Sequence, residues 1–283
     1  MIVRNSLLTV LGSVMLLGAA LPTHAESVLK VGLGADPDML DPHLARTYYG
    51  RFVFASLCDR LVDVDANLKV VPGLATAWTW SEDGKTLTMT LREGVTFHDG
   101  EKFDAAAAKY SLDRALTLPG SLRKSELSSV ESVEVTGPMQ IALHLKTPDS
   151  ALLMQLTDRA GAMLAPEAAK KANFAAHPVC SGPYKFDSRV AQDRIVLTRF
   201  DNYWNKGAYH FDKVVYLPIP DASVRLANLR AGDLDLTEGV AASDVKTVQG
   251  DSKLQLAKVT GLGYQGITFN INNGKVPAND PFK

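Results

Sequence analysis

The sequence is poor in cysteine and lacks the common catalytic motifs, and these absences exclude several classes of enzyme. The 283 residues include two cysteines, Cys58 and Cys180, and neither belongs to a C-x-x-C pair. A zinc ribbon or a thioredoxin-like redox site therefore has no support. No G-x-S-x-G, H-E-x-x-H or G-x-x-x-x-G-K-[ST] pattern occurs. We identify no catalytic residue, no metal ligand and no cofactor, and we expect a protein that is not an enzyme.

An excess of charge of one sign is also lacking. The chain has 30 lysines and arginines and 31 aspartates and glutamates, which gives a formal net charge of −1 at pH 7. A near-neutral chain has no general attraction to nucleic acid or to an anionic membrane, so neither is expected as a partner. With 46% hydrophobic and 22% charged residues, the composition is that of a globular protein. The length is sufficient for a large core or for two lobes.

The N-terminus has the pattern of a secretory signal peptide. Residues 7–21 carry no charge, follow Arg4, and lead through Pro22 to small residues at the positions that precede a cut after Ala25. The run is shorter than the roughly 20 apolar residues that a membrane-spanning helix needs. We therefore expect residues 1–25 to be cleaved after Ala25, which leaves a periplasmic protein without membrane insertion.

Export would place the two cysteines in an oxidising compartment. In an oxidising compartment a lone pair of cysteines commonly forms a disulfide. We predict a bridge between Cys58 and Cys180, with two buried, unpaired thiols as the alternative. Closing so long a loop could stabilise the fold by up to ~5 kcal/mol in the chain-entropy model.

Residue patterns up to position 178 predict a strand, a helix and then a compact α+β region. Residues 48–62 carry apolar residues at helical spacing, and Asp83-Gly84 joins two alternating runs as in a β-hairpin. Asp104 can cap a helix that ends near Thr117. The other elements expected here are strands at 28–33, 130–135 and 140–145, and helices at 150–157 and 166–172.

Beyond residue 178 the pattern changes to that of an α/β domain. The expected strands lie at 184–190, 194–200, 213–219, 234–237, 254–260 and 264–271. Between the third and the fourth, Asp221 caps a helix that Gly232 ends. The order strand, helix, strand predicts that those two strands run parallel.

Two partial motifs are better interpreted as turns. Asp63 opens a stretch like a calcium loop, but Leu68 and Leu74 stand where that loop needs Gly and Glu. Residues 261–266 match G-x-G-x-x-G, yet the residues that follow read as a strand. A nucleotide site would need a helix there, so that its backbone amides face the pyrophosphate.

Several segments together resemble the peptide and nickel group of extracytoplasmic solute-binding proteins. In chain order they read PGLATAW (72–78), SEDGK (81–85), LREGVTFHDG (91–100), SGPYKF (181–186), FDNYW (200–204), PDASVR (220–225) and LRAGDLD (229–235). They span nearly the whole chain after residue 25, and the ordered set is far more specific than any one segment. The sequence departs from the family pattern at Cys180-Ser181, where Thr or Gly usually precedes Gly-Pro-Tyr, which favours the bridge to Cys58.

The resemblance implies an α/β fold, in which a periplasmic-binding-protein-like lobe contains an inserted α+β subdomain. By this analogy residues 26–65 and 179–275 form the first lobe, and residues 66–178 form the insertion. The family continues past a stretch like 279–283 into a second lobe. The resemblance therefore implies that residues 276–283 begin a truncated second lobe, most of which is missing from this chain.

The resemblance also implies a function and a set of ligand-binding residues. Family members are monomers that deliver di- or oligopeptides, or a related solute, to the membrane subunits of an ABC importer. Their ligand contacts come from the loop after the first strand, the last third of the insertion and the crossover region. In this sequence those places hold Arg46, Tyr48 and Tyr49, then Arg159, then Tyr264. Arginine can pair bidentately with a carboxylate, and tyrosine offers an apolar face and a hydroxyl.

Two of these residues, and the function itself, have alternative interpretations. Arg159 could be a surface charge and Tyr264 could be a core residue. A periplasmic hydrolase of small peptides, or a ligand-presenting partner of a chemoreceptor, are the alternative functions. The resemblance covers glutathione-like ligands, nickel chelates and sugars as well as peptides.

Overall fold

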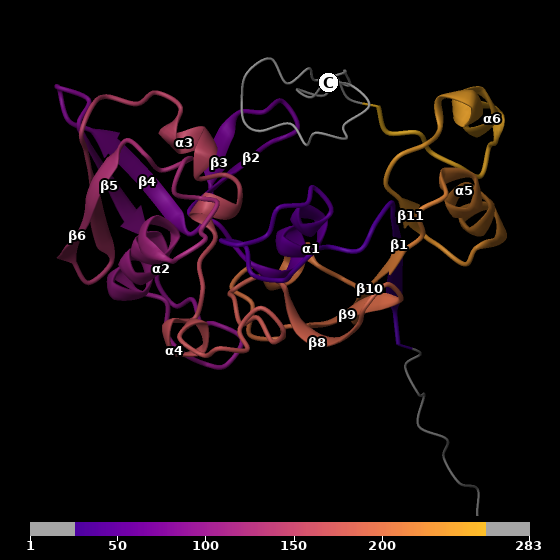
Figure 1. The fold of residues 1–283 in the computed structure, drawn as a ribbon, viewed down its shortest axis with the longest axis horizontal. Coiled ribbons are helices and arrows are strands. Elements are labelled where there is room, and N and C mark those ends of the chain that lie inside the picture. The colour runs from indigo at the N-terminus through magenta and orange to yellow at the C-terminus, as the bar shows by residue number, and fades with distance from the viewer. Residues whose placement is uncertain (1–25, 259–283) are drawn as a thin grey trace, which may run out of the picture. The chain divides into compact units, whose positions relative to one another are not determined.

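The computed structural model describes residues 26–258, and Figure 1 labels most of their helices and strands. Tertiary contacts divide the chain into two units, and the boundary in the sequence falls between Gly239 and Val240. The first unit holds both large sheets, and the second contains η3 (Ala242–Asp244) and α6 (Val245–Gly250). Within residues 26–258 no helix has the length and apolarity to cross a membrane.

The first sheet has five strands in the order β11-β1-β10-β9-β8 (Figure 1). Its strands are β1 (Val28–Leu33), β8 (Tyr184–Val190), β9 (Arg194–Arg199), β10 (Lys213–Pro218) and β11 (Leu236–Thr237). β1 is parallel to both of its neighbours, β10 and β11, while β9 is antiparallel to β8 and β10. The mixed sheet therefore places the carboxyl ends of β1, β10 and β11 at one edge.

Helix α5 (Ala222–Ala231) connects β10 to β11 with the boundaries that the sequence predicts. The carboxylate of Asp221 accepts hydrogen bonds from the amides of Ser223 and Val224 at its N-terminus. Gly232 ends the helix with φ of 86°, a left-handed conformation that favours glycine. The predicted parallel direction of β10 and β11 is confirmed, with β1 lying between them.

The second sheet is antiparallel and has the order β4-β5-β7-β6. Its strands are β4 (Ala75–Trp80), β5 (Thr86–Leu91), β6 (Val130–Gly137) and β7 (Gln140–Leu145), and α2 (Ala105–Thr117) packs against β6 and β7. The alternating pattern of β5 explains the packing, because Leu87, Met89 and Leu91 are buried while the threonines between them are more exposed.

Helix α2 begins where the sequence predicts it. The Asp104 side chain accepts a hydrogen bond of 2.9 Å from the amide of Ala107, which satisfies one of the free donors of the first turn. Ala108 and Leu112 are buried on the face that packs against the sheet. The helix ends at Thr117, also as predicted.

The remaining elements are short. They are α1 (Gly50–Leu57), β2 (Val62–Val64), β3 (Val70–Pro72), α3 (Leu152–Gln155), η1 (Arg159–Gly161), α4 (Pro166–Ala169) and η2 (Lys206–Ala208). The calcium-like segment is a surface turn between β2 and β3, in which Asp65 accepts hydrogen bonds from the amides of Asn67 and Lys69. That interpretation of the motif is confirmed.

Two predictions of secondary structure are wrong. The helix expected at 48–62 ends at Leu57, because the chain becomes extended at Cys58 and continues into β2. Residues 254–258 form no strand, although their apolar residues suggested one. The strand expected at 264–271 lies outside the described residues.

One hydrophobic core joins the two sheets of the first unit. Val31 of β1, Leu87 of β5, Ile141 of β7 and Ile195 of β9 all belong to the same cluster of buried side chains. The lobe and insertion boundaries that the resemblance implies correspond to two sheets, but the core is continuous between them. The boundaries therefore stay a prediction, whereas the mixed α/β class is confirmed.

Candidate ligand-binding site

The loop that follows β1 folds back over the carboxyl end of its own strand. Tyr49 lies so close to Gly34 that a Cβ atom at this glycine would be 2.7 Å from the tyrosine hydroxyl. A side chain at this position would displace the Tyr49 ring. In open α/β sheets, ligands commonly bind outside the carboxyl ends of the parallel strands. The loop is thus placed where this class of fold binds ligands.

A groove of about 300 Å³ lies next to this loop. It is lined by three aromatic rings, three arginines, two aspartates and smaller residues: Tyr48, Arg51, Phe52, Phe54, Ala55, Cys58, Arg60, Asp63, Val64, Thr157, Asp158, Arg159 and Ala162. Three cations against two anions leave one positive charge in excess. Such a lining suits a small ligand that has an apolar part and a negative charge.

Arg159 is buried at the edge of this groove. Its Nη1 donates hydrogen bonds to the carbonyls of Ala45 (2.8 Å) and Thr47 (3.4 Å). Its Nε has no hydrogen-bond partner and is 3.7 Å from the Asp158 carboxylate. Burial and the nearby Arg123 lower the pKa of the guanidinium, which still stays protonated at neutral pH. The interpretation of Arg159 as a surface charge is therefore wrong.

Tyr48 and Tyr49, at the end of the loop, have different surroundings. The Tyr48 ring lines the groove and is 54% exposed, with ring-to-ring distances of 5.9 Å to Tyr49 and 5.2 Å to Phe52. Tyr49 is partly buried against the core and is not a lining residue. The exposed Tyr48 is thus available to a ligand, while Tyr49 supports it in an edge-to-face contact.

Two further predicted site residues are not placed in the groove. Arg46 is exposed and does not line it; its backbone amide donates to the Asp38 carboxylate at 2.9 Å. Tyr264 lies outside the described residues. Of the five ligand-binding residues predicted from the sequence, the structure brings Tyr48 and Arg159 together in one groove.

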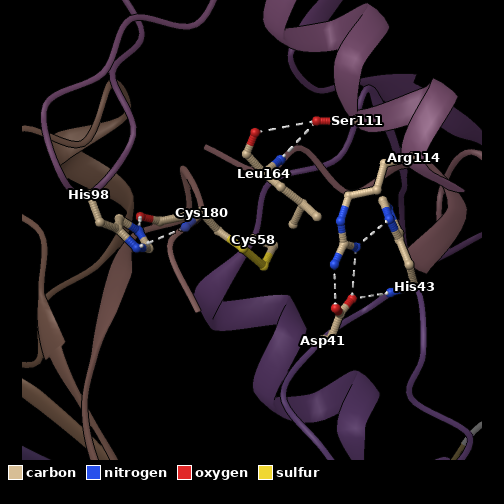
Figure 2. The surroundings of a disulfide bond; sticks show 9 residues. Asp41, His43, Cys58, His98, Ser111, Arg114, Leu164 and Cys180 are labelled. Carbon is tan, nitrogen blue, oxygen red and sulfur yellow. Dashed lines mark hydrogen bonds and ion pairs between the residues drawn. A yellow bond between two sulfur atoms is a disulfide. The ribbon is translucent and has the colours of Figure 1, made fainter. Parts of the chain in front are cut away.

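A disulfide joins Cys58 to Cys180, with their Cα atoms 4.8 Å apart (Figure 2). Cys58 lies at the end of α1 and lines the groove, whereas Cys180 precedes the return of the chain to the five-stranded sheet. The amide of Gly182 also donates to the carbonyl of Leu57 at 3.0 Å. The disulfide and this hydrogen bond hold the end of α1, where Cys58 lines the groove, against the segment that leads into β8 of the five-stranded sheet.

His98, which comes from a third segment of the chain, makes hydrogen bonds to the residues around Cys180 (Figure 2). Its Nδ1 accepts from the backbone amide of Cys180 at 3.3 Å, and its Nε2 is 3.0 Å from the carbonyl of Gly182. An amide can only donate and a carbonyl can only accept, so the ring is neutral with its proton on Nε2. Burial, the largest cause, lowers the pKa of His98 to about 4.

Sequence reasoning missed several charged residues of the groove. Arg51 pairs with Asp158 at 2.6 Å, and Arg60 pairs with Asp63 at 2.5 Å. The second pair is three residues apart and could have been read from the sequence, but Arg51 and Asp158 are 107 positions apart. Among residues 26–258 no group of three or more His, Cys, Asp or Glu side chains could hold a metal ion.

Comparisons with known proteins support the resemblance. Residues 69–283 match the family model described as bacterial extracellular solute-binding proteins, family 5, middle. The glutathione-binding protein GsiB of Salmonella paratyphi A is 32% identical over 256 residues, which cover 89% of this chain and 50% of the relative. GsiB of Escherichia coli O1:K1 is 30% identical over 272 residues, which cover 95% of this chain and 53% of that relative.

Solved structures agree with the fold. The binding protein AgaA of A. tumefaciens R10 in complex with agropinic acid has a TM-score of 0.75 and 31% identity, covering 80% of this chain and 46% of that protein. DppA from Helicobacter pylori in complex with peptide STSA has a TM-score of 0.71 and 28% identity, and the match covers 80% of this chain and 49% of that protein. The murein tripeptide-binding protein MppA has a TM-score of 0.74 at 22% identity and shows the fold alone.

The chain spans about half the length of the curated relatives that it matches. Within that span the family model covers most of the sequence, and the ordered motifs, the mixed sheet and the related structures agree. The chain therefore belongs to family 5 of the bacterial extracellular solute-binding proteins.

Proposed function

We propose that the protein is a periplasmic receptor that binds a small peptide or a related solute and delivers it to the membrane subunits of an ABC importer. In this proposal residues 1–25 are removed after Ala25, the mature protein is a monomer, and it performs no catalysis. Residues 66–178 are the insertion, between the two parts of the first lobe. The relatives are named for binding glutathione, which is itself a small peptide.

The observation that carries the proposal is the excess of positive charge at the groove. The groove has one more arginine than it has carboxylates, and Arg159 is buried at its edge with an Nε that makes no hydrogen bond. A ligand carboxylate placed against these arginines would balance this charge and form a charge-assisted hydrogen bond. A peptide with a free carboxylate has the required chemistry.

The aromatic side of the groove supports the same class of ligand. Tyr48 and Phe52 form an edge-to-face pair next to the charged residues. An exposed tyrosine beside a cation can cover the apolar part of a peptide while the cation binds its charged end. The expected ligand is thus amphipathic, with one negative charge close to an apolar side chain.

Titration calorimetry with reduced glutathione and with peptide STSA tests the proposal. The wild-type protein should bind at least one of them, and Tyr48→Ala should weaken binding several-fold, since each ligand CH₂ group that the ring covers contributes about 0.8 kcal/mol. Arg194→Gln is the matched control, because Arg194 is exposed and does not line the groove. Equal loss of affinity in both variants would contradict the assignment of the groove.

The same samples separate a receptor from a hydrolase. After prolonged incubation, the bound probe is released by denaturing the protein and its mass is measured. Recovery of the intact peptide supports the receptor, whereas cleavage that depends on the protein would replace the proposal with the hydrolase alternative.

A further inference from the structure

The residues just before Tyr48, which we call the binding loop (residues 41–47), are attached mainly to residues that lie between β1 and β8 in the sequence: Arg114, Leu122 and Arg159. The first attachment is a buried ion pair (Figure 2). Arg114 of α2 donates from Nη1 and Nη2 to the two carboxylate oxygens of Asp41, at 3.1 and 2.6 Å. Their side chains are only 9% and 2% exposed. A bidentate pair of this kind fixes both distance and orientation.

His43 completes this attachment without adding a charge. Its Nδ1 lies 2.9 Å from Arg114 Nη1 and accepts from it, and its backbone amide donates to Asp41 at 2.9 Å. Because Arg114 can only donate, the ring is neutral, and burial lowers the pKa of His43 to about 3. The amide of Leu122 donates to the His43 carbonyl at 3.0 Å. Asp41 is therefore the counter-ion of Arg114.

Inside the binding loop, five successive backbone amides depend on two aspartates. The amides of residues 43–45 donate to the side chain or the carbonyl of Asp41, and those of residues 46 and 47 donate to the carboxylate of Asp38. Arg159 binds the carbonyls of Ala45 and Thr47 from the other side. If Asp41 moves, the hydrogen bonds of the amides of residues 43–45 change.

We propose that Arg114 is a positioning residue for the groove. Through Asp41 it holds the binding loop against α2, so that Tyr48 keeps its place beside Arg159. Arg114 itself does not line the groove. The effect on ligand binding rests on the function proposed above, whereas the effect on the loop does not.

Hydrogen exchange tests the loop directly. Arg114→Gln should raise the exchange rate of peptides that cover residues 41–47 by roughly tenfold or more, because the bidentate, charge-assisted contact to Asp41 is lost. Exchange in β1 and β10 should change much less. Arg114→Lys keeps the charge but loses the bidentate geometry, so it should give a smaller increase.

Leu112→Ala is the matched control. Leu112 is buried on the same helix, so its truncation destabilises the protein without removing a contact to Asp41. A role of Arg114 in stability alone predicts the same exchange profile in both variants. The positioning role predicts faster exchange confined to the binding loop in Arg114→Gln.

Binding of reduced glutathione and peptide STSA to the same variants gives the second measurement. Arg114→Gln should weaken binding roughly tenfold, in line with the loosened loop, while Leu112→Ala should not. Unchanged exchange at residues 41–47 would overturn the proposal. A loosened loop with unchanged affinity would overturn its link to the groove. Failure of the wild-type protein to bind either probe would count against the proposed function, and exchange would still decide the role of Arg114.

Discussion

Replacing His98 by glutamine should remove one defined contribution to the acid sensitivity of the fold. His98 is buried, and its neutral ring connects the amide of Cys180 to the carbonyl of Gly182. Protonation of Nδ1 would place an N–H group against the Cys180 amide, so the buried site cannot accept the second proton without losing a hydrogen bond. Glutamine keeps a polar side chain but does not titrate.

The pKa of His98 is about 4 in the folded protein, whereas a histidine in the unfolded chain has its ordinary pKa of 6.5. Between these values the unfolded chain binds more protons than the folded protein, so the free energy of unfolding falls as the pH falls. One pKa unit corresponds to about 1.4 kcal/mol, which gives a loss of roughly 3 kcal/mol between pH 6.5 and pH 4. Above pH 6.5 both states are neutral at this position and the contribution is constant.

Urea unfolding at pH 7 and at pH 4 measures this loss in wild type, His98→Gln and the control His210→Gln. At pH 7, His98→Gln should be less stable than wild type because it loses two hydrogen bonds. At pH 4 the difference between the two should shrink by roughly 3 kcal/mol. His210 is the control because it is exposed and lies outside this junction. A constant difference between wild type and His98→Gln at both pH values would refute the reasoning.

Two further substitutions test the junction around the disulfide. Replacing Cys58 and Cys180 by serine should lower the free energy of unfolding by up to ~5 kcal/mol in the chain-entropy model, since the bridge spans 122 positions; equal urea midpoints would contradict this. Gly182→Ala should cost about 1–3 kcal/mol, because its Cβ would lie 2.5 Å from the Leu57 backbone. Gly207→Ala, where a Cβ meets nothing within 4 Å, should melt close to wild type.

Local signals in the sequence predict much of the fold. The cap at Asp104 and the stop at Gly232 locate two helix ends, and the turn at Asp83-Gly84 locates a hairpin, because each depends on residues only a few positions apart. The early end of α1 could not be predicted. At Cys58 the chain leaves the helix for contacts with residues near 180, which the local apolar spacing does not contain.

The site was less accessible to sequence reasoning. Tyr48 and Arg159 were selected because their positions resemble those of family ligand contacts, and the structure places both in one groove. The partners that orient them are distant in the chain, as in the pairs Arg114–Asp41 and Arg51–Asp158. Charge and spacing do not reveal which of 30 basic residues pairs with which acid. These ion pairs can be identified only in the folded structure.

The proposed function requires, above all, that Arg159 binds a ligand carboxylate. Calorimetry with peptide STSA and with the same peptide amidated at its C-terminus measures this claim in wild type and in Arg159→Gln. The wild-type protein should prefer the free acid by roughly tenfold or more, the range expected for a charge-assisted hydrogen bond, and Arg159→Gln should bind both forms with similar affinity. An equal preference for the free acid in both proteins would show that Arg159 does not contact the carboxylate.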